Sequence, residues 1–389
     1  MRTLSPTAVL LVALTGLFLW GGDAVAVEKP LSRDVLKTCL SLGRRHLMTN
    51  QLSDGRFRYE YDFVKKIDVE GDNSVRQAGA LWGLCSIHRD QPSAESRRAL
   101  LKGFAFFRAH SKRADGKRFV LYPGSSSGKT GTMALLCLAI EDFLSVEAAG
   151  KHAELRKELD EILAFLRSIR RNDGRFAGRY RHRDGSGYGD PSPYSDGETL
   201  LALVKSVKEH GKTEWKSEVL ASADSMYTHW AKRALIRGLD LDTTKGFYQW
   251  GSMAFIEIAT AKWKGTQRFA RHVVGLAHWM IDIHRTLARR RNTAYAYEGI
   301  ISAVRASRLL GDKAAEAKFL SVIEEGLSKL CSWQLGSPIA NRFLRRQKDI
   351  PEIAIGGVMN AKSDPVLRID VTQHQMHAVV LALKHVYTR

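Results

Sequence analysis

The stretch Asn172-Asp173-Gly174-Arg175-Phe176 decides the fold, because the chain repeats it. Related phrases are Ser53-Asp54-Gly55-Arg56-Phe57 and Ala114-Asp115-Gly116-Lys117-Arg118-Phe119. Asp-Gly forms turns because glycine readily adopts a positive φ, and the apolar ring that follows can fold back onto a core. The same turn between similar elements indicates an architecture built from one repeated unit.

Helical periodicity of apolar residues surrounds these turns, and no convincing alternating strand pattern appears. The periodicity predicts twelve helices, over residues 31–50, 73–90, 93–110, 129–147, 151–171, 194–210, 213–236, 248–262, 265–287, 292–310, 312–332 and 370–387. The links after the even-numbered helices are very short, whereas those after the odd-numbered helices are long, except for residues 288–291. In an antiparallel series this alternation gathers the long loops at one end of the molecule.

Small residues open the even-numbered helices, as in Gln77-Ala78-Gly79-Ala80 and Gly251-Ser252-Met253-Ala254, and they permit the close packing of an inner ring. The odd-numbered helices are longer and more charged, which suits an outer ring. The sequence therefore predicts an all-α fold, an (α/α)6 toroid of twelve helices with its long loops at one end. An open helical solenoid is the alternative, but the last helix, 370–387, has the pattern of an inner helix that closes the ring.

The first 26 residues predict export. Arg2 precedes an apolar run over residues 8–20, and Ala24-Val25-Ala26 has the small residues that a signal peptidase requires. Because the run is too short for a bilayer core of ~30 Å, we expect residues 1–26 to be a cleaved signal peptide. Residues 27–389 would then form a single toroid domain that is periplasmic or secreted.

The chain carries 60 Lys and Arg against 41 Asp and Glu, a net charge of +19. Such a charge favours anionic partners, namely acidic glycans, membrane lipid headgroups or nucleic acid. Export makes nucleic acid the least favoured, so we predict an anionic polysaccharide as the partner, with a membrane surface as a secondary contact. The oligomeric state stays open.

Four cysteines, Cys39, Cys85, Cys137 and Cys331, lie separately in apolar helical runs. An even number in an oxidising compartment permits two disulfides, and buried free thiols are the alternative. We predict no metal and no cofactor, because neither a CxxC nor an HExxH motif is present.

All six inner helices begin at the long-loop end, where their free N–H groups attract anions. At the second helix, Asn73 or Asp72 is expected to cap the N-terminus, while Arg76 and Gln77 would face a substrate. At the fourth, Lys129 follows a glycine-rich segment that has one residue too few for a phosphate loop, and it is predicted to contact an anion.

The sixth helix follows Gly187-Tyr188-Gly189, and Tyr188 is a candidate substrate contact. Ser195 or Asp196 can cap it, with Glu198 at capping-box spacing. That interpretation leaves Asp196 and Tyr194 as candidates for catalysis and Glu198 as a cap or a substrate contact.

Aromatic residues and acids mark the remaining helix starts. Tyr248 and Trp250 suit stacking on a sugar ring, and Asn292 would cap the tenth helix next to Tyr297. Tyr295 and Glu298 share a helix face three residues apart and are candidates for proton transfer. In the last helix, Asp370 lies one turn before His374 and can orient its imidazole. With His377 the pair also offers an Asp/His/His set that could hold a metal, but no second cluster supports a metal site.

These features resemble the α/α toroids of carbohydrate-active enzymes, including polysaccharide lyases and glycosidases. Tyr194-Ser195-Asp196-Gly197-Glu198, followed by apolar residues 200–204, is similar in pattern to an inner helix of glucuronyl C5-epimerases, and residues 368–381 resemble their C-terminal helix. The resemblance implies uronic acid substrates and proton transfer by tyrosines and a carboxylate.

The sequence thus predicts an enzyme that performs acid–base chemistry on an acidic polysaccharide, as a lyase, an epimerase or a hydrolase. Hydrolysis requires two carboxylates that flank the bond, for which Asp196 and Glu298 are the best pair. The alternative is a non-catalytic protein that binds anionic glycans or assembles polymers on the same scaffold.

Overall fold

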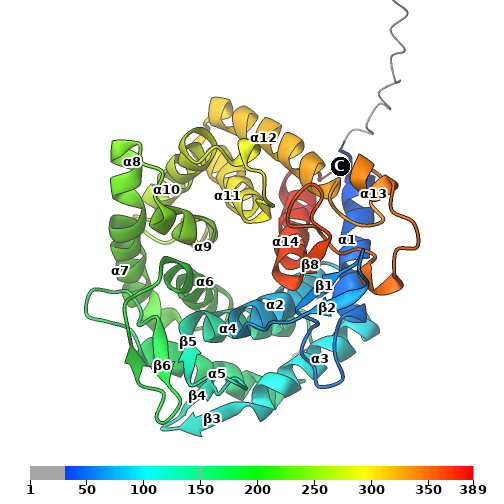
Figure 1. Ribbon diagram of the computed structural model, residues 1–389. Helices are drawn as coiled ribbons and strands as arrows, with labels where there is room; N and C mark the ends of the chain where they lie inside the picture. The colour runs from blue at the N-terminus through cyan, green and yellow to red at the C-terminus, as the bar shows by residue number, and fades with distance from the viewer. Residues whose placement is uncertain (1–30, 149, 389) are drawn as a thin grey trace, which may run out of the picture.

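The computed structural model describes residues 31–148 and 150–388. Six inner helices surround its centre (Figure 1): α2 (Ser74–Asp90), α4 (Thr130–Leu144), α6 (Pro193–Glu209), α9 (Asp242–Thr260), α11 (Ala294–Leu310) and α14 (Ile369–His385). The outer ring consists of α1 (Arg33–Thr49), α3 (Ala94–Ala109), α5 (Ala153–Ser168), α7 (Lys216–Met226) with η2 (Tyr227–Lys232) and α8 (Arg233–Arg237), α10 (Gln267–His278) with η3 (Trp279–Ile283), and α12 (Lys313–Cys331).

The inner ring is closed. Each inner helix packs against the next one along the chain, and α14 packs against both α11 and α2. The twelve-helix toroid that the sequence predicts is therefore confirmed, as is the role of the last helix in closing the ring. The predicted signal peptide, residues 1–26, lies outside the described residues.

Burial distinguishes the helices of the inner ring from those of the outer ring. Every residue of α4 is buried, including both of its acids, whereas α5 buries only one face. Glycines allow the close approach, because a Cβ on Gly131 would lie 2.4 Å from Oε2 of Glu198 on the next inner helix. A helix that is hydrophobic on all sides belongs inside a protein, and the ring supplies that environment.

The long loops contain short strands that the sequence analysis did not predict. They form a sheet of β1 (Glu60–Asp62), β2 (Ile67–Val69) and β8 (Val366–Arg368), a β3 (Ser111–Ala114) and β4 (Lys117–Val120) pair, and a sheet of β5 (Ser127–Lys129), β6 (Arg179–Arg181) and β7 (Gly187–Tyr188). None of these strands is longer than four residues, too short to show an alternating pattern. The antiparallel pairing of β1 with β8 joins the first long loop to the last.

Short helical turns also occur between the main helices: η1 (Thr213–Trp215) directly before α7, η4 (Thr286–Ala288) after η3, and α13 (Arg342–Arg345) and η5 (Glu352–Ala354) in the last long loop. Most of the helix boundaries lie within a few residues of the prediction, but α9 begins at Asp242, six residues before the predicted start. This earlier start brings Lys245 onto the ring.

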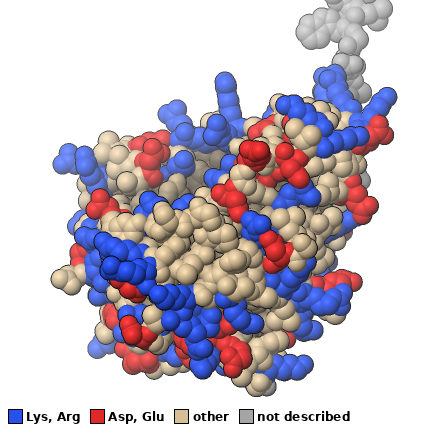
Figure 2. Space-filling view, turned by 60° about the horizontal axis from the view of Figure 1, so that its bottom comes forward, with Lys and Arg blue, Asp and Glu red and all other residues tan. Residues whose placement is uncertain are grey.

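The four cysteines are buried and free, which corresponds to the thiol alternative. No helix among the described residues is both long and apolar enough to cross a membrane. Lys and Arg are spread over the face that Figure 2 shows, with Asp and Glu among them. The net charge of +19 is therefore not gathered into one patch on that face.

A glycine substitution tests the ring packing. A Cβ on Gly326 of α12 would lie 1.9 Å from the hydroxyl oxygen of the buried Tyr297, whereas a Cβ on Gly79 of α2 would meet nothing closer than 3.4 Å. We expect Gly326→Ala to lower the free energy of unfolding by about 1–3 kcal/mol, because overpacking strains the core. Gly79→Ala should leave it unchanged or raise it, because alanine favours a helix. Urea unfolding of both variants measures the difference, and equal effects would contradict the packing.

Candidate functional site

A cavity of about 490 Å³ opens at the long-loop end, where the sequence analysis places the site. We call it the front cavity. It is lined by Asn73, Val75, Arg76, Gly79, Leu135, Tyr194, Glu198, Lys245, Gln249, Trp250, Asn292, Ala294, Tyr295, Asn360, Arg368, Asp370, Val371, Gln373 and His374. Inner-helix starts supply most of these residues, so the ring brings together side chains that are far apart in the sequence.

The centre of the site is the Glu298 carboxylate of α11, which is fully buried beneath the front cavity. Its Oε1 lies 3.0 Å from Nδ1 of His374, and its Oε2 lies 3.0 Å from Nδ1 of His377. Gln249 of α9 donates from Nε2 to Oε2 at 2.7 Å. Three inner helices thus meet at one carboxylate.

The charges at this centre stabilise one another. Burial alone would raise the pKa of Glu298, but His377 and His374 hold it below its ordinary value. Burial alone would lower the pKa of His374, but the Glu298 carboxylate raises it above 6.5. Because Nδ1 of His374 faces Glu298, its Nε2 is the nitrogen left for the front cavity. His374 can therefore exchange a proton with a bound molecule.

Glu198 of α6 is a second group in the front cavity that can exchange protons. Its side chain is buried, and Oε2 has no hydrogen-bond partner among the described residues. Burial raises the pKa of Glu198 to about 8, so the carboxyl group is largely protonated at neutral pH. The predicted capping box is absent, because the N-cap of α6 is Ser192 and no side chain caps this helix.

Asp196, which the sequence predicts as a catalytic acid, does not line the front cavity. It accepts hydrogen bonds from the Phe176 amide at 2.9 Å and from the Trp230 indole at 2.8 Å. Gln77 also lies outside the front cavity, and its Oε1 accepts a hydrogen bond from the Phe57 amide at 2.8 Å. Each of these residues lies twenty positions after the phenylalanine of a repeated turn, so both tie a loop to an inner helix.

Other candidates are also placed away from the front cavity. Tyr248 and Tyr297 are fully buried between helices, and Lys129 and Tyr188 belong to the loop strands β5 and β7. In each case the sequence showed the helix start but not the direction of the side chain. Substrate contacts by these four residues are therefore not supported.

The remaining candidates do reach the front cavity. Asn73 caps α2 as predicted, accepting from the Val75 and Arg76 amides. Asn292 accepts from the Ala294 amide at 2.9 Å. Trp250 lines the wall, and burial raises the pKa of Tyr295 to about 12, so this phenol keeps its proton at neutral pH.

The sequence suggested that Asp370 orients the His374 imidazole, but Asp370 is engaged elsewhere. Arg368 donates to it from Nη2 at 3.0 Å, and Nε of Arg76 lies 3.1 Å from its Oδ2. Glu298 takes the orienting role instead. No cluster of His, Cys, Asp and Glu in the described residues is arranged to hold a metal ion.

Lys245 and Gln249 are among the lining residues that were not predicted as site residues. Lys245 depends on the early start of α9, whereas Gln249 lies within the predicted helix, where only the direction of its side chain was missed. A helical spacing from Gly246 through Trp250 to Met253 was the available signal.

No protein-family profile and no curated protein sequence matches the chain. Solved structures do share its fold. A sugar epimerase from a ruminal bacterium aligns with a TM-score of 0.65 at 10% identity, over 90% of this chain and 98% of that one. Cellobiose 2-epimerase from Bacillus thermoamylovorans aligns with a TM-score of 0.62 at 10% identity, over 88% of this chain and 99% of that one.

An α-1,6-mannanase variant from Salegentibacter sp., in complex with α-1,6-mannotetrose, gives a TM-score of 0.63 at 8% identity, over 90% of this chain and 98% of that one. The fold is thus the α/α toroid that these carbohydrate-active enzymes also have, as the sequence predicted. The finer resemblance to glucuronyl C5-epimerases stays a prediction.

The raised pKa of Glu198 predicts a pH dependence of stability. Between its ordinary value of 4.5 and about 8, the unfolded chain loses this proton while the folded protein keeps it. The free energy of unfolding of the wild type should therefore fall relative to that of Glu198→Gln as the pH rises across this window, and then level off. Urea unfolding at successive pH values measures it, with the exposed Glu95→Gln as control. A difference that does not vary with pH would contradict a buried, protonated Glu198.

Proposed function

We propose that the front cavity is the active site of a carbohydrate-active enzyme that transfers protons on a sugar, as epimerases and isomerases do. The observation that carries the proposal is His374, a cavity-lining imidazole whose Nδ1 is held by the buried Glu298. A base or acid with a pKa near the working pH is what such a reaction needs. The sugar epimerase and isomerase structures that share the fold support this choice.

His374 and Glu198 form a pair that suits proton transfer to and from carbon. One group removes a proton from the carbon next to a carbonyl or carboxylate, and the electron pair is delocalised onto that oxygen. A second group then returns a proton to the carbon, and return to the opposite face inverts the centre. His374 and Glu198 line the same cavity and influence each other's charge, so we assign the two proton positions to them.

Hydrolysis is less well supported, because it requires two carboxylates that flank the glycosidic bond. Asp196 is bonded away from the cavity, and Glu298 is bridged by two histidines. Asp370 lines the cavity but is engaged by Arg368 and Arg76. The pair that the sequence analysis favoured for a hydrolase is thus not formed.

The charges that line the front cavity favour an acidic sugar. Asp370 faces two arginines, and Glu198 is largely uncharged at neutral pH. Lys245 has no ion-pair partner among the described residues. A uronate carboxylate would supply the missing negative charge and also the group that stabilises the carbanion.

We further propose that the protein acts outside the cytoplasm, where the signal sequence over residues 1–26 would direct it. Acidic polysaccharides of the envelope or the surroundings are substrates that suit this location. The net charge of +19 would attract such polymers.

Proton exchange tests the proposed function. The protein is incubated in D₂O with uronate-containing oligosaccharides and, separately, with neutral mannose oligosaccharides, and deuterium in the sugar is followed by NMR and mass spectrometry. We expect deuterium to enter the uronate alone. His374→Asn should slow this entry by about 10²-fold or more, which is the contribution of a positioned acid or base.

The control is His278→Asn, which changes a partly exposed histidine of the outer helix α10 and should keep the wild-type rate. Exchange that survives in His374→Asn would contradict the role of His374. New reducing ends without exchange would indicate a hydrolase, and unsaturated products would indicate a lyase.

A further inference from the structure

A second, larger cavity of about 890 Å³ lies at the tight-turn end of the toroid, opposite the long loops. We call it the rear cavity. Its wall is made by the last turns of the inner helices, including Arg89 of α2, Lys208 of α6 and Lys384 of α14, together with the start of α1. Volumes of about 300–1,000 Å³ are typical of sites for small molecules.

Basic side chains outnumber acidic ones in this cavity. Seven Lys and Arg line it against four Asp and Glu in the described part of the chain: Arg33, Lys37, Arg89, Lys205, Lys208, Arg305 and Lys384 against Asp90, Asp142, Glu209 and Glu257. Two of the acids are each shared by two bases. Lys205 and Arg89 both contact Asp142, and Lys208 and Arg305 both contact Glu257.

The remaining cations are not neutralised. Arg33, Lys37 and Lys384 have no ion-pair partner among residues 31–148 and 150–388, and only Arg33 has a hydrogen-bond partner there, the Tyr387 carbonyl. Lys384 stands in the last turn of α14, where a helix dipole favours a cation. Arg33 and Lys37 stand in the first two turns of α1, where the dipole disfavours one. Helix stabilisation therefore does not explain Lys37.

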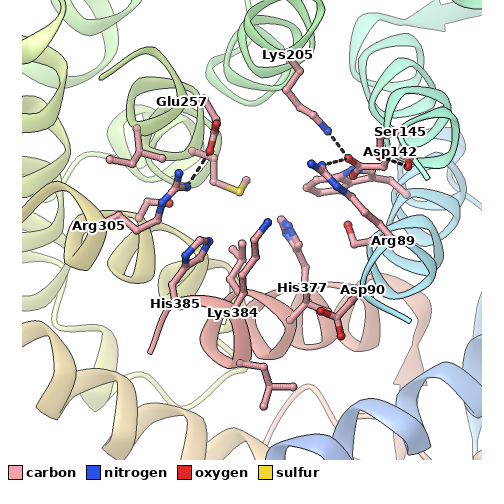
Figure 3. Close-up of a pocket in the computed structure, with 18 of the residues that line it drawn as sticks. Arg89, Asp90, Asp142, Ser145, Lys205, Glu257, Arg305, His377, Lys384 and His385 are labelled. Atoms are coloured by element: carbon pink, nitrogen blue, oxygen red, sulfur yellow. Dashed lines mark hydrogen bonds and ion pairs between the residues drawn. The ribbon is translucent and has the colours of Figure 1, made fainter. Parts of the chain in front are cut away.

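The floor of the rear cavity carries a buried polar group that points into it. His377 is 6% exposed, its Nδ1 is bound to Glu298, and its ring packs against Trp82 with 4.3 Å between centroids. The hydrogen bond of its ring is made by Nδ1, which leaves Nε2 without a partner among the described residues and the ring at the cavity wall. Figure 3 shows His377, Lys384, Arg305 and His385 projecting into one space.

We propose that the rear cavity is a second ligand site, which takes a small organic polyanion. Its oxyanion groups would contact Arg33, Lys37 and Lys384, and its body would lie over the apolar floor of Trp82, Met253 and Ile256 with a hydrogen bond to His377. Charged hydrogen bonds of this kind favour compact carboxylates and phosphates. The site is separate from the front cavity, so it does not depend on the proposed function.

Calorimetry with three anionic probes tests this site: fructose 1,6-bisphosphate, citrate and inorganic phosphate, with glucose as the neutral comparison. We expect one of the two organic polyanions to bind more tightly than inorganic phosphate, and glucose not to bind. The tighter of the two shows whether phosphate or carboxylate groups are preferred. Lys384→Gln should weaken its binding about tenfold, which corresponds to about 1.4 kcal/mol for the loss of a charged hydrogen bond.

The matched control is Lys102→Gln, which removes the same charge from an exposed position on α3. It should bind the probe as the wild type does. Both lysines are exposed, so neither substitution should disturb folding. In NMR spectra, the bound probe should also shift the imidazole signals of His377.

Three results would overturn the proposal. The first is the absence of binding by any of the probes at low salt. The second is equal weakening in Lys384→Gln and Lys102→Gln, which would mean diffuse attraction to a basic surface. The third is binding that leaves His377 unperturbed, because the ligand would then lie outside the rear cavity.

Discussion

The structure depends on a carboxylate that is buried at the centre of the toroid. A charge without water is expensive unless it is paired and hydrogen-bonded, and Glu298 is fully buried. Its partners come from two other inner helices, Gln249 from α9 and both His374 and His377 from α14. The requirement to satisfy this one group therefore holds three inner helices in register at the point where the ring closes.

The same centre separates two cavities and contributes to both. His374 lines the front cavity, whereas His377, three residues further along α14, lines the rear one. Trp250 belongs to the front wall and Trp82 to the rear, and their rings lie 5.4 Å apart. A helix that places two histidines on either side of one carboxylate thus serves both ends of the toroid.

The fold was open to prediction because it rests on features that are local in the sequence. The spacing of apolar residues, the Asp-Gly turns and the alternation of short and long links each report on a few neighbouring residues, and together they define the two rings. The short loop strands escaped prediction for the same reason. β1 pairs with β8, about 300 residues away, and so few residues show no pattern of their own.

The site was only partly predictable because it depends on side-chain direction across the ring. Glu298, His374 and Arg76 were expected at the long-loop end, and they lie there. The sequence shows two acids, Asp196 and Glu198, at a helix start but not which one faces the axis, and only Glu198 lines the front cavity. The first six residues of α9, which the periodicity did not reveal, also hid Lys245.

The most direct test of this account is an NMR titration of the His374 imidazole in the wild type and in Glu298→Gln. The account predicts that His374 titrates above the ordinary value of 6.5 in the wild type. It also predicts that the pKa falls when Glu298 loses its charge. A His374 that titrates at or below 6.5, or is unchanged by Glu298→Gln, would contradict the claim that the buried carboxylate prepares this histidine for proton transfer.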